Sequence, residues 1–95
     1  MITRIIKVKL PNENAEPFMT YMAEFIKKAK QFANIQHADF FADKEEEGQF
    51  LIYTIWKTQG ALSKFRKSEL NLEFIDRLNH WSKDAYTAWT VENVF

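Results

Sequence analysis

The sequence predicts an α+β fold in which helices cover one face of an antiparallel sheet. Apolar residues alternate with a period of two in four separate segments, and between these segments they recur at helical spacing. The 95 residues include only two glycines and two prolines, so little of the chain is available for disorder. We expect a single domain that spans residues 1–95.

The first segment, residues 2–10, is predicted to be a half-buried strand. Its even-numbered positions are apolar except for Arg4, which is therefore expected on the buried side. Pro11 ends the strand because proline cannot donate to a sheet. Asn14 is the expected cap of the next helix, with Pro17 in its first turn. An apolar stripe at helical spacing predicts the helix itself: Phe18, Met22, Phe25, Ala29 and Phe32.

Two further strands are predicted at residues 35–43 and 49–57, joined by a charged hairpin that ends in Gly48. Alternation places four residues on one side of the first of these strands: Ile35, His37, Asp39 and Phe41. The second strand is rich in β-branched and aromatic residues and exposes little on either side, as expected for a central strand.

Two short helices and a strand follow. Thr58 is predicted to cap a helix that turns Leu62 and Phe65 inward, and Ser68 is predicted to cap the next one. That second helix carries its own apolar stripe, formed by Leu70, Phe74, Leu78 and Trp81. Residues 84–94 alternate as a last strand. The complete order is that of the split βαβ, or ferredoxin-like, arrangement.

Composition narrows the choice of partners and compartment. The formal net charge is zero, which argues against a nucleic-acid partner. Without cysteine there is no disulfide framework and no thiolate chemistry. No apolar run reaches the ~18 residues of a membrane span, and the N-terminus lacks the core of a signal peptide. We therefore expect a cytoplasmic protein without a membrane partner.

The predicted helices cover one face of the sheet, and no element of the chain remains to bury the other face. A chain of this size buries only ~60–65% of its unfolded surface, yet this one carries nine Phe, three Trp and three Tyr. The economical cover is a second copy of the chain, joined through a two-fold contact. A homodimer is therefore expected.

Four stretches carry a more specific pattern: Asp39-Phe40-Phe41-Ala42-Asp43, Phe50-Leu51-Ile52-Tyr53-Thr54-Ile55-Trp56, Gly60-Ala61-Leu62 and the helix after Ser68. Together they resemble the antibiotic biosynthesis monooxygenase-like family. The most specific part is the Tyr-x-x-Trp strand, with the Ala-Leu helix five residues beyond Trp56. The resemblance covers nearly the whole chain. It implies a dimeric α+β barrel, in which two ferredoxin-like subunits pack sheet against sheet.

The resemblance implies several chemistries: cofactor-free oxygenation of polyphenols and quinols, haem degradation and the processing of quorum signals. The haem-degrading branch uses an Asn on the first strand, a Trp on the helix after the central strand and an axial His on the last helix. Here the first strand has no Asn, Phe65 matches the Trp, and Phe74 with Ile75 occupies the region of the His. His80 lies about one and a half turns further on. Haem degradation is therefore disfavoured, and we expect no cofactor and no metal.

Three polar residues are candidate catalytic groups. Arg4 could anchor a substrate carboxylate or enolate in a cleft; alternatively it forms a structural ion pair with Asp39 or Glu92, or reaches solvent. His37 and Asp39 are two apart on a strand and so point to one side, where the carboxylate would raise the basicity of the imidazole for proton abstraction. The alternative for this pair is a solvated or interface contact.

Three aromatic residues are predicted to wall a site for a flat ligand: Tyr53, Trp56 and Trp89. Each could instead belong to the core, and Trp56 looks like the structural tryptophan of the family. By resemblance, the chain is expected to be a cofactor-independent monooxygenase of a small aromatic or quinol-like molecule.

Two other functions stay open. One is a non-catalytic module for small-ligand binding or dimerisation, and the other is a different small-molecule enzyme, such as an isomerase or a signal-processing enzyme. A cleft with convergent polar groups would favour an enzyme. The module would be favoured if the space were plugged by Phe18, Phe25, Phe65 and Phe74.

Overall fold

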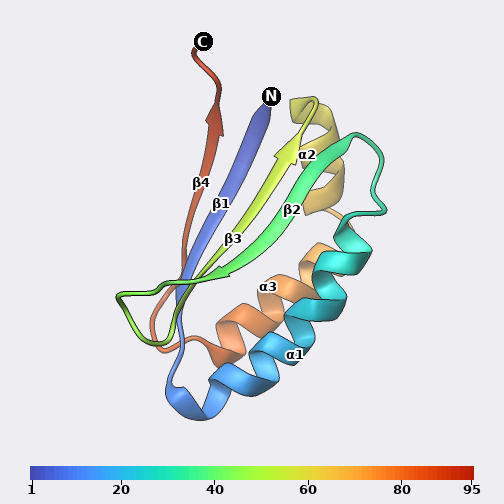
Figure 1. Cartoon of the computed structure of the whole chain (residues 1–95). Coiled ribbons are helices and arrows are strands. Elements are labelled where there is room, and N and C mark those ends of the chain that lie inside the picture. Colours follow the sequence, from blue (N-terminus) through green and yellow to red (C-terminus); the bar gives the residue numbers. More distant parts are fainter.

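The computed structural model describes all 95 residues, arranged as four strands and three helices (Figure 1). In chain order these are β1 (Ile2–Lys9), α1 (Asn12–Ala29), β2 (Ile35–Ala42), β3 (Gln49–Trp56), α2 (Gln59–Arg66), α3 (Glu69–Trp81) and β4 (Thr87–Glu92). The predicted order of elements is confirmed, and so is the α+β, ferredoxin-like fold.

All strands belong to one antiparallel sheet in the order β2-β3-β1-β4. The helices gather on one face of this sheet, and no other element covers the opposite face (Figure 1). The central strands β1 and β3 pair along their whole length, from Ile2 opposite Trp56 to Lys9 opposite Gln49. Residues that lie opposite one another point to the same side. The even-numbered residues of both central strands therefore face the helices.

The hydrophobic core lies between this side of the sheet and the helices. Phe25 of α1 stacks on Phe74 of α3 with ring centroids 4.2 Å apart, and Trp56 lies 4.8 Å from Phe65 by the same measure. Full burial of one such side chain contributes about 1.5–3 kcal/mol. The stripe predicted for α1 is buried as far as the helix extends: Phe18, Met22, Phe25 and Ala29.

Both short helices begin at their predicted caps. The hydroxyl of Thr58 accepts the backbone N–H of Ala61 at 3.1 Å, and the hydroxyl of Ser68 accepts that of Asn71 at 3.2 Å. Each cap satisfies an amide that has no partner within its helix. The side chains predicted to point inward from α2, Leu62 and Phe65, are buried.

The start of α1 differs from the prediction. The helix begins at Asn12 with Pro11 in the capping position and no side-chain cap. Asn14, the predicted cap, instead donates its side-chain amide to the backbone carbonyl of Trp81 at 3.0 Å. Pro17 lies in the second turn, where it removes one backbone hydrogen bond of the helix. The capping prediction is wrong because a contact with the distant end of α3 takes the Asn14 side chain.

The prediction that Ile35 and His37 share a side is wrong, because β2 contains a β-bulge between them. Ile35 pairs with Trp56 whereas His37 pairs with Ile55, so Gln36 is an extra residue between them. Ile35 consequently faces the helices and packs against the core, not on the side of His37. Strict alternation fails here because the bulge inserts one residue without a partner.

The first three strands each end one residue earlier than predicted, and two further elements differ more from their predicted bounds. β4 covers Thr87–Glu92 and not the whole of residues 84–94, and α1 ends at Ala29, before Phe32. Phe32 nevertheless packs edge-on against Phe65, with ring centroids 5.0 Å apart. Phe32 therefore contributes to the core as the stripe predicts, although it lies beyond the end of the helix.

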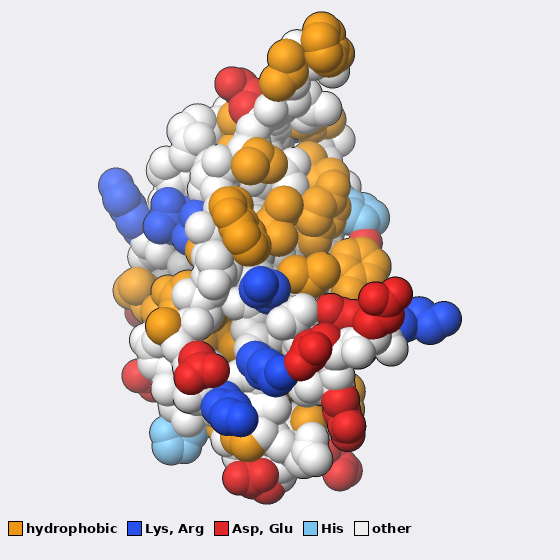
Figure 2. All heavy atoms as spheres, turned by 90° about the vertical axis from the view of Figure 1, so that its left-hand side faces the viewer, with side chains coloured by type: hydrophobic (Ala, Val, Ile, Leu, Met, Phe, Trp, Pro, Cys, Tyr) orange, Lys and Arg blue, Asp and Glu red, His pale blue; other side chains and the backbone are white.

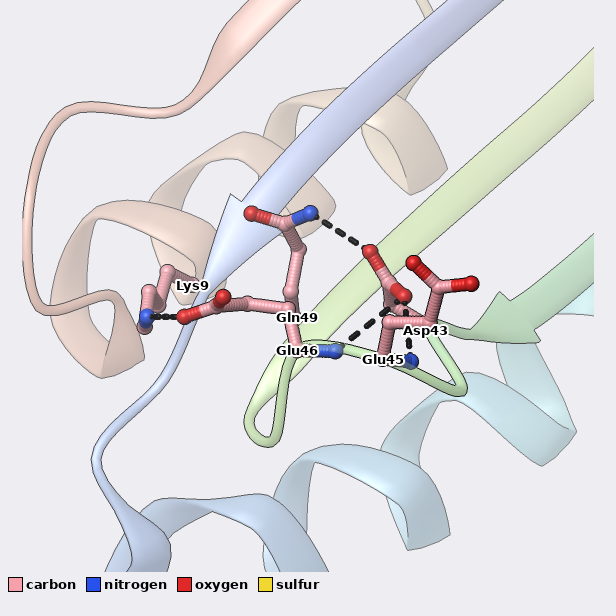
Figure 3. A network of polar contacts seen from close by, with 5 residues as sticks. All are labelled: Lys9, Asp43, Glu45, Glu46 and Gln49. Atoms are coloured by element: carbon pink, nitrogen blue, oxygen red, sulfur yellow. Dashed lines mark hydrogen bonds and ion pairs between the residues drawn. The ribbon is translucent and has the colours of Figure 1, made fainter.

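Asp43 organises the hairpin between β2 and β3 (Figure 3). Its carboxylate accepts the backbone N–H groups of Glu45 at 2.8 Å and Glu46 at 3.2 Å, and the side-chain amide of Gln49 at 2.8 Å. Glu46 also forms an ion pair with Lys9 of β1. The Glu45 N–H, followed by the Gln49 amide, lowers the pKa of Asp43 by stabilising its ionised form.

Gly48 closes this hairpin with a φ of 81°, in the left-handed region that favours glycine. A Cβ atom at this position would lie 2.6 Å from the carbonyl oxygen of Leu10. The carbonyl of Gly48 in turn accepts the Leu10 N–H at 2.8 Å. The hairpin is thus anchored to the end of β1 through a position that admits no side chain.

Replacing Asp43 with Asn should lower the free energy of unfolding at neutral pH, because a neutral amide is a weaker acceptor for these three donors. The folded-state pKa is lowered, so the stabilisation is fully present above the unfolded value of 3.8 and is lost as the pH falls through the folded value. Urea unfolding should therefore show the stability difference between wild type and Asp43→Asn shrinking in strong acid.

Asp84→Asn is the matched control, since Asp84 is an exposed aspartate of the loop before β4. Its stability should follow that of the wild type at neutral pH. A difference for Asp43→Asn that stays constant from neutral pH into strong acid would contradict the role given to the Asp43 carboxylate.

Candidate functional site

A cavity of about 310 Å³ lies between the helix-facing side of the sheet and the helices. Its volume is at the lower end of the ~300–1,000 Å³ typical of small-molecule sites. Strands β1 and β3 form the floor, the helices form the walls, and the segment before β4 closes one edge. Twelve residues line it: Arg4, Ile6, Phe25, Ile52, Thr54, Phe65, Arg66, Asn71, Leu72, Phe74, Ile75 and Tyr86.

The floor follows from the register of the central strands. Arg4 and Ile6 of β1 lie opposite Thr54 and Ile52 of β3, all on the helix-facing side. Arg4 is thus on the buried side, as the alternation predicts. Beside Thr54 it forms a polar interruption in a face that is otherwise apolar.

Aromatic rings form the walls. Phe25 stacks on Phe74, and its centroid lies 6.2 Å from that of Phe65 at an interplanar angle of 64°. Three of the four phenylalanines considered as a plug therefore line an open space, while Phe18 is buried elsewhere, against Phe40 and Trp81. The walls offer flat apolar surfaces to a planar ligand.

Arg4 supplies a cation at the floor. Its Nη1 atom donates to the hydroxyl of Thr90 at 2.8 Å. The structural ion pairs considered for it, with Asp39 or Glu92, are not formed. Burial lowers the pKa of Arg4, and the positive charge of Arg66 lowers it further, but a guanidinium stays protonated in proteins. The site therefore holds a charged donor without a counter-ion.

Four polar lining residues were not candidates from the sequence: Thr54, Arg66, Asn71 and Tyr86. The Asn71 side chain donates to the backbone carbonyl of Arg66 at 3.1 Å and so holds the turn between α2 and α3. A sequence signal exists for Asn71, because it lies on the same helical face as Phe74 and Leu78 and is buried with them. Arg66 and Tyr86 are near Arg4 only through the tertiary fold.

His37 and Asp39 lie on the opposite face of the sheet, called here the open face. They are opposite Ile55 and Tyr53 in register, and Nε2 of the His37 imidazole contacts the Asp39 carboxylate. The two side chains do share one side and meet, as predicted. The sheet separates them from the cavity, however, so within one chain they are not brought together with Arg4.

The predicted aromatic walls are also divided between the two faces. Tyr53 and Trp89 lie on the open face, where the Tyr53 ring is 6.1 Å from that of His37. Trp56 is fully buried behind Phe65 and is not a lining residue. Its indole Nε1–H donates to the hydroxyl of Thr54 at 3.0 Å. Trp56 thus supports the floor and wall of the cavity from behind.

No group of three or more His, Cys, Asp or Glu side chains is placed to hold a metal ion. None of the three helices is both long enough and apolar enough to cross a membrane.

Fold and cavity together define a class: a small ferredoxin-like α+β protein with a ligand-sized cavity between its sheet and its helices. A sequence model of the family described as antibiotic biosynthesis monooxygenase matches residues 1–77. The chain belongs to this family. None of the curated proteins compared with the chain matches it.

Solved structures share the fold over nearly the entire chain. One antibiotic biosynthesis monooxygenase is 19% identical, with a TM-score of 0.89 and 99% of each chain covered. A candidate monooxygenase of the same kind from Deinococcus radiodurans is 18% identical, with a TM-score of 0.92 over 98% of this chain and 92% of that one. Rv0793 from Mycobacterium tuberculosis is 10% identical, with a TM-score of 0.90 over 99% and 95%. At these identities the likeness establishes the fold.

Replacing Thr54 with Val should lower the free energy of unfolding by about 1–3 kcal/mol, because the buried indole N–H of Trp56 loses its acceptor. Thr54→Ser keeps the hydroxyl and should cost only the ~0.8 kcal/mol of one buried methyl-sized group. Chemical unfolding of both variants measures the difference. Equal stability of the two variants would show that this hydrogen bond does not stabilise the floor of the cavity.

Proposed function

We propose that the protein is a cofactor-independent monooxygenase whose cavity binds a small aromatic or quinol-like substrate. The observation that supports this most is the place of Arg4, an unpaired guanidinium beneath walls of phenylalanine rings. A planar phenol would lie against the rings and direct its oxygen to the cation. Membership of the antibiotic biosynthesis monooxygenase family supports the reaction class.

Ionisation of the substrate is the step that Arg4 would assist. In a partly desolvated site a guanidinium stabilises a phenolate or enolate more than the neutral form, and so favours loss of the substrate proton. The resulting anion gives up electrons to dioxygen more readily than the neutral phenol does. Arg4 keeps its own proton, so its role is to stabilise charge and not to act as a base.

The proposed oxidation needs no reactant other than the substrate and dioxygen. In an anthrone-like substrate, the ring methylene carbon loses two hydrogens and gains one oxygen atom, which makes it a carbonyl. Dioxygen accepts the four electrons of the two C–H bonds. One of its oxygen atoms ends in the carbonyl and the other in water.

Proton handling by His37 with Asp39 is a separate part of the proposal. No Asp, Glu or His lines the cavity, so the substrate proton would leave either to water or to a group outside the lining. The His37–Asp39 pair lies across the sheet with Tyr53 and Trp89. A substrate of this pair would therefore lie on the open face, where His37 and Tyr53 line a separate hollow, and not in the cavity around Arg4. Trp56 does not line the cavity. Its proposed role there is to pack against Phe65, which does.

Oxygen uptake by the purified, metal-free protein with hydroquinones and anthrone-like phenols tests the proposed activity. Arg4→Gln should slow uptake about tenfold or more, because a charged hydrogen bond to the anion contributes about 1.5–3 kcal/mol. Lys30→Gln removes an exposed charge at the end of α1, outside the cavity lining, and should match the wild type. Uptake at the protein-free rate with every substrate would refute the oxygenase.

His37→Ala decides the proton-handling hypothesis in the same assay. A fall in uptake, with the unfolding curve of the wild type retained, would support a role for His37. Unchanged uptake would confine the chemistry to the cavity around Arg4.

A second candidate function is ligand binding without chemistry. It is favoured by one observation, the absence of an Asp, Glu or His side chain from the cavity lining. The same absence speaks against an isomerase that moves protons within this cavity. Saturable binding of a phenol without oxygen uptake would identify this binding module.

The open face supports a homodimer as part of the proposal. The register places apolar side chains of all four strands there: Ile5, Phe41, Leu51, Tyr53, Ile55, Trp89 and Val91. Figure 2, which views the molecule from the side away from the helices, shows hydrophobic side chains gathered above a band of acidic and basic ones. A contiguous apolar face of this kind is typical of a protein interface. Two copies related by a two-fold axis would cover it on both.

Val91→Glu should convert the dimer to a monomer, because the two-fold contact would bury a new carboxylate from each copy. Met19→Glu is a matched control, since Met19 on α1 and Val91 are both 45% exposed but lie on opposite sides of the sheet. Sedimentation at micromolar concentration should give a dimer for the wild type and Met19→Glu. A monomeric wild type would refute the proposed homodimer.

A further inference from the structure

Two arginines from different parts of the chain line the same cavity. Arg4 comes from the floor strand β1, and Arg66 comes from the last residue of α2, where it is exposed at the mouth. Tyr86, half-buried in the segment before β4, lines the cavity with them. Burial lowers the pKa of Arg4, the charge of Arg66 lowers it further, and Tyr86 acts in the opposite direction. The two guanidinium groups therefore share one electrostatic environment.

Neither guanidinium is neutralised by the protein. No carboxylate forms an ion pair with Arg4 or Arg66, and the lining contains no Asp or Glu. The one side-chain hydrogen bond of Arg4 goes to the neutral hydroxyl of Thr90. Placing two like charges together at a partly apolar site costs free energy. An anion bound between them would offset that cost.

The position of Arg66 is held by the turn that follows α2. Asn71 donates its side-chain amide to the Arg66 carbonyl at 3.1 Å, and the Ser68 hydroxyl donates to the Phe65 carbonyl at 2.6 Å. These contacts fix the backbone of Arg66 while its side chain stays at the cavity mouth. Asn71 is in this sense a positioning residue for Arg66.

We infer that the ligand of this cavity carries a carboxylate in addition to its aromatic ring, bound between Arg4 and Arg66 with the ring against the phenylalanine walls. This inference rests on the proposed function only in taking the cavity as the ligand site. The planar guanidinium fork matches a carboxylate with parallel hydrogen bonds. The volume of about 310 Å³ limits the ligand to a small molecule.

The test is calorimetric titration of the wild-type protein, under anaerobic conditions, with a hydroxynaphthoate and with its methyl ester. The ester keeps the ring and the shape but has no charge. The acid should bind about tenfold or more tightly than the ester, as expected for charge-assisted hydrogen bonds. Equal affinity of the acid and the ester, or no binding of either, would overturn the inference.

Variants assign the effect to the two arginines. Arg66→Gln and Arg4→Gln should each weaken binding of the acid about tenfold, and Arg66→Gln should leave binding of the ester within about twofold of the wild type. Lys64→Gln is the matched control, because Lys64 is an exposed cation of the same helix that lines a different hollow. It should bind the acid like the wild type. An acid preference that Arg66→Gln leaves intact would also overturn the inference.

Two further measurements distinguish a carboxylate from another anion, and ligand binding from oxygenation. Naphthyl phosphate has the same ring and a different anion, and its binding about tenfold or more tightly than the acid would overturn the assignment to a carboxylate. Anaerobic titration measures no oxidation. A protein that prefers the acid but takes up no oxygen would thus refute only the oxygenase, and uptake without an acid preference would refute only this inference.

Discussion

The register of β1 against β3 is the constraint on which the rest of the structure depends. It aligns the even-numbered residues of both strands on one side, so that Ile2 lies beside Trp56 and Val8 beside Phe50 over a continuous apolar surface. The helices attach to that surface through buried aromatic side chains. A slip of one residue would turn this surface to solvent and bring lysines of β1 against the helices. The energy of the core therefore fixes the place of every other residue on these strands.

The cavity arises where this apolar surface is interrupted. Arg4 in β1, Thr54 in β3 and Asn71 in α3 each replace a large apolar side chain in a stripe that is otherwise buried, and all three line the same space. Their polar atoms are engaged by Thr90, Trp56 and the backbone of Arg66. Stacked phenylalanine rings close the space from above. Packed aromatic walls and a cation without a counter-ion support the proposal that the cavity binds a ligand.

The sheet separates two surfaces with different roles. The helix-facing side holds the cavity, whereas the open face holds an apolar patch and the His37–Asp39 pair. The proposed function assigns the ligand to the first surface and a second copy of the chain to the other. Because alternate residues of a strand point to opposite faces, a single substitution on β1 or β3 affects only one of these surfaces directly. Ligand binding and association can therefore be tested independently.

Local patterns in the sequence determined the order of elements, the caps at Thr58 and Ser68, the hairpin at Gly48 and the buried side of Arg4. These features depend on neighbours within a few residues, which periodicity and capping chemistry describe. Tertiary structure alone decided the contact of Asn14 with Trp81, the bulge at Gln36 and the meeting of Arg66 and Tyr86 with Arg4. It also placed His37 and Asp39 across the sheet from Arg4, although the shared side of His37 and Asp39 and the buried side of Arg4 were predicted correctly. Periodicity within a strand tells which residues share a side, but only the packing of strands and helices decides which sides of different elements meet.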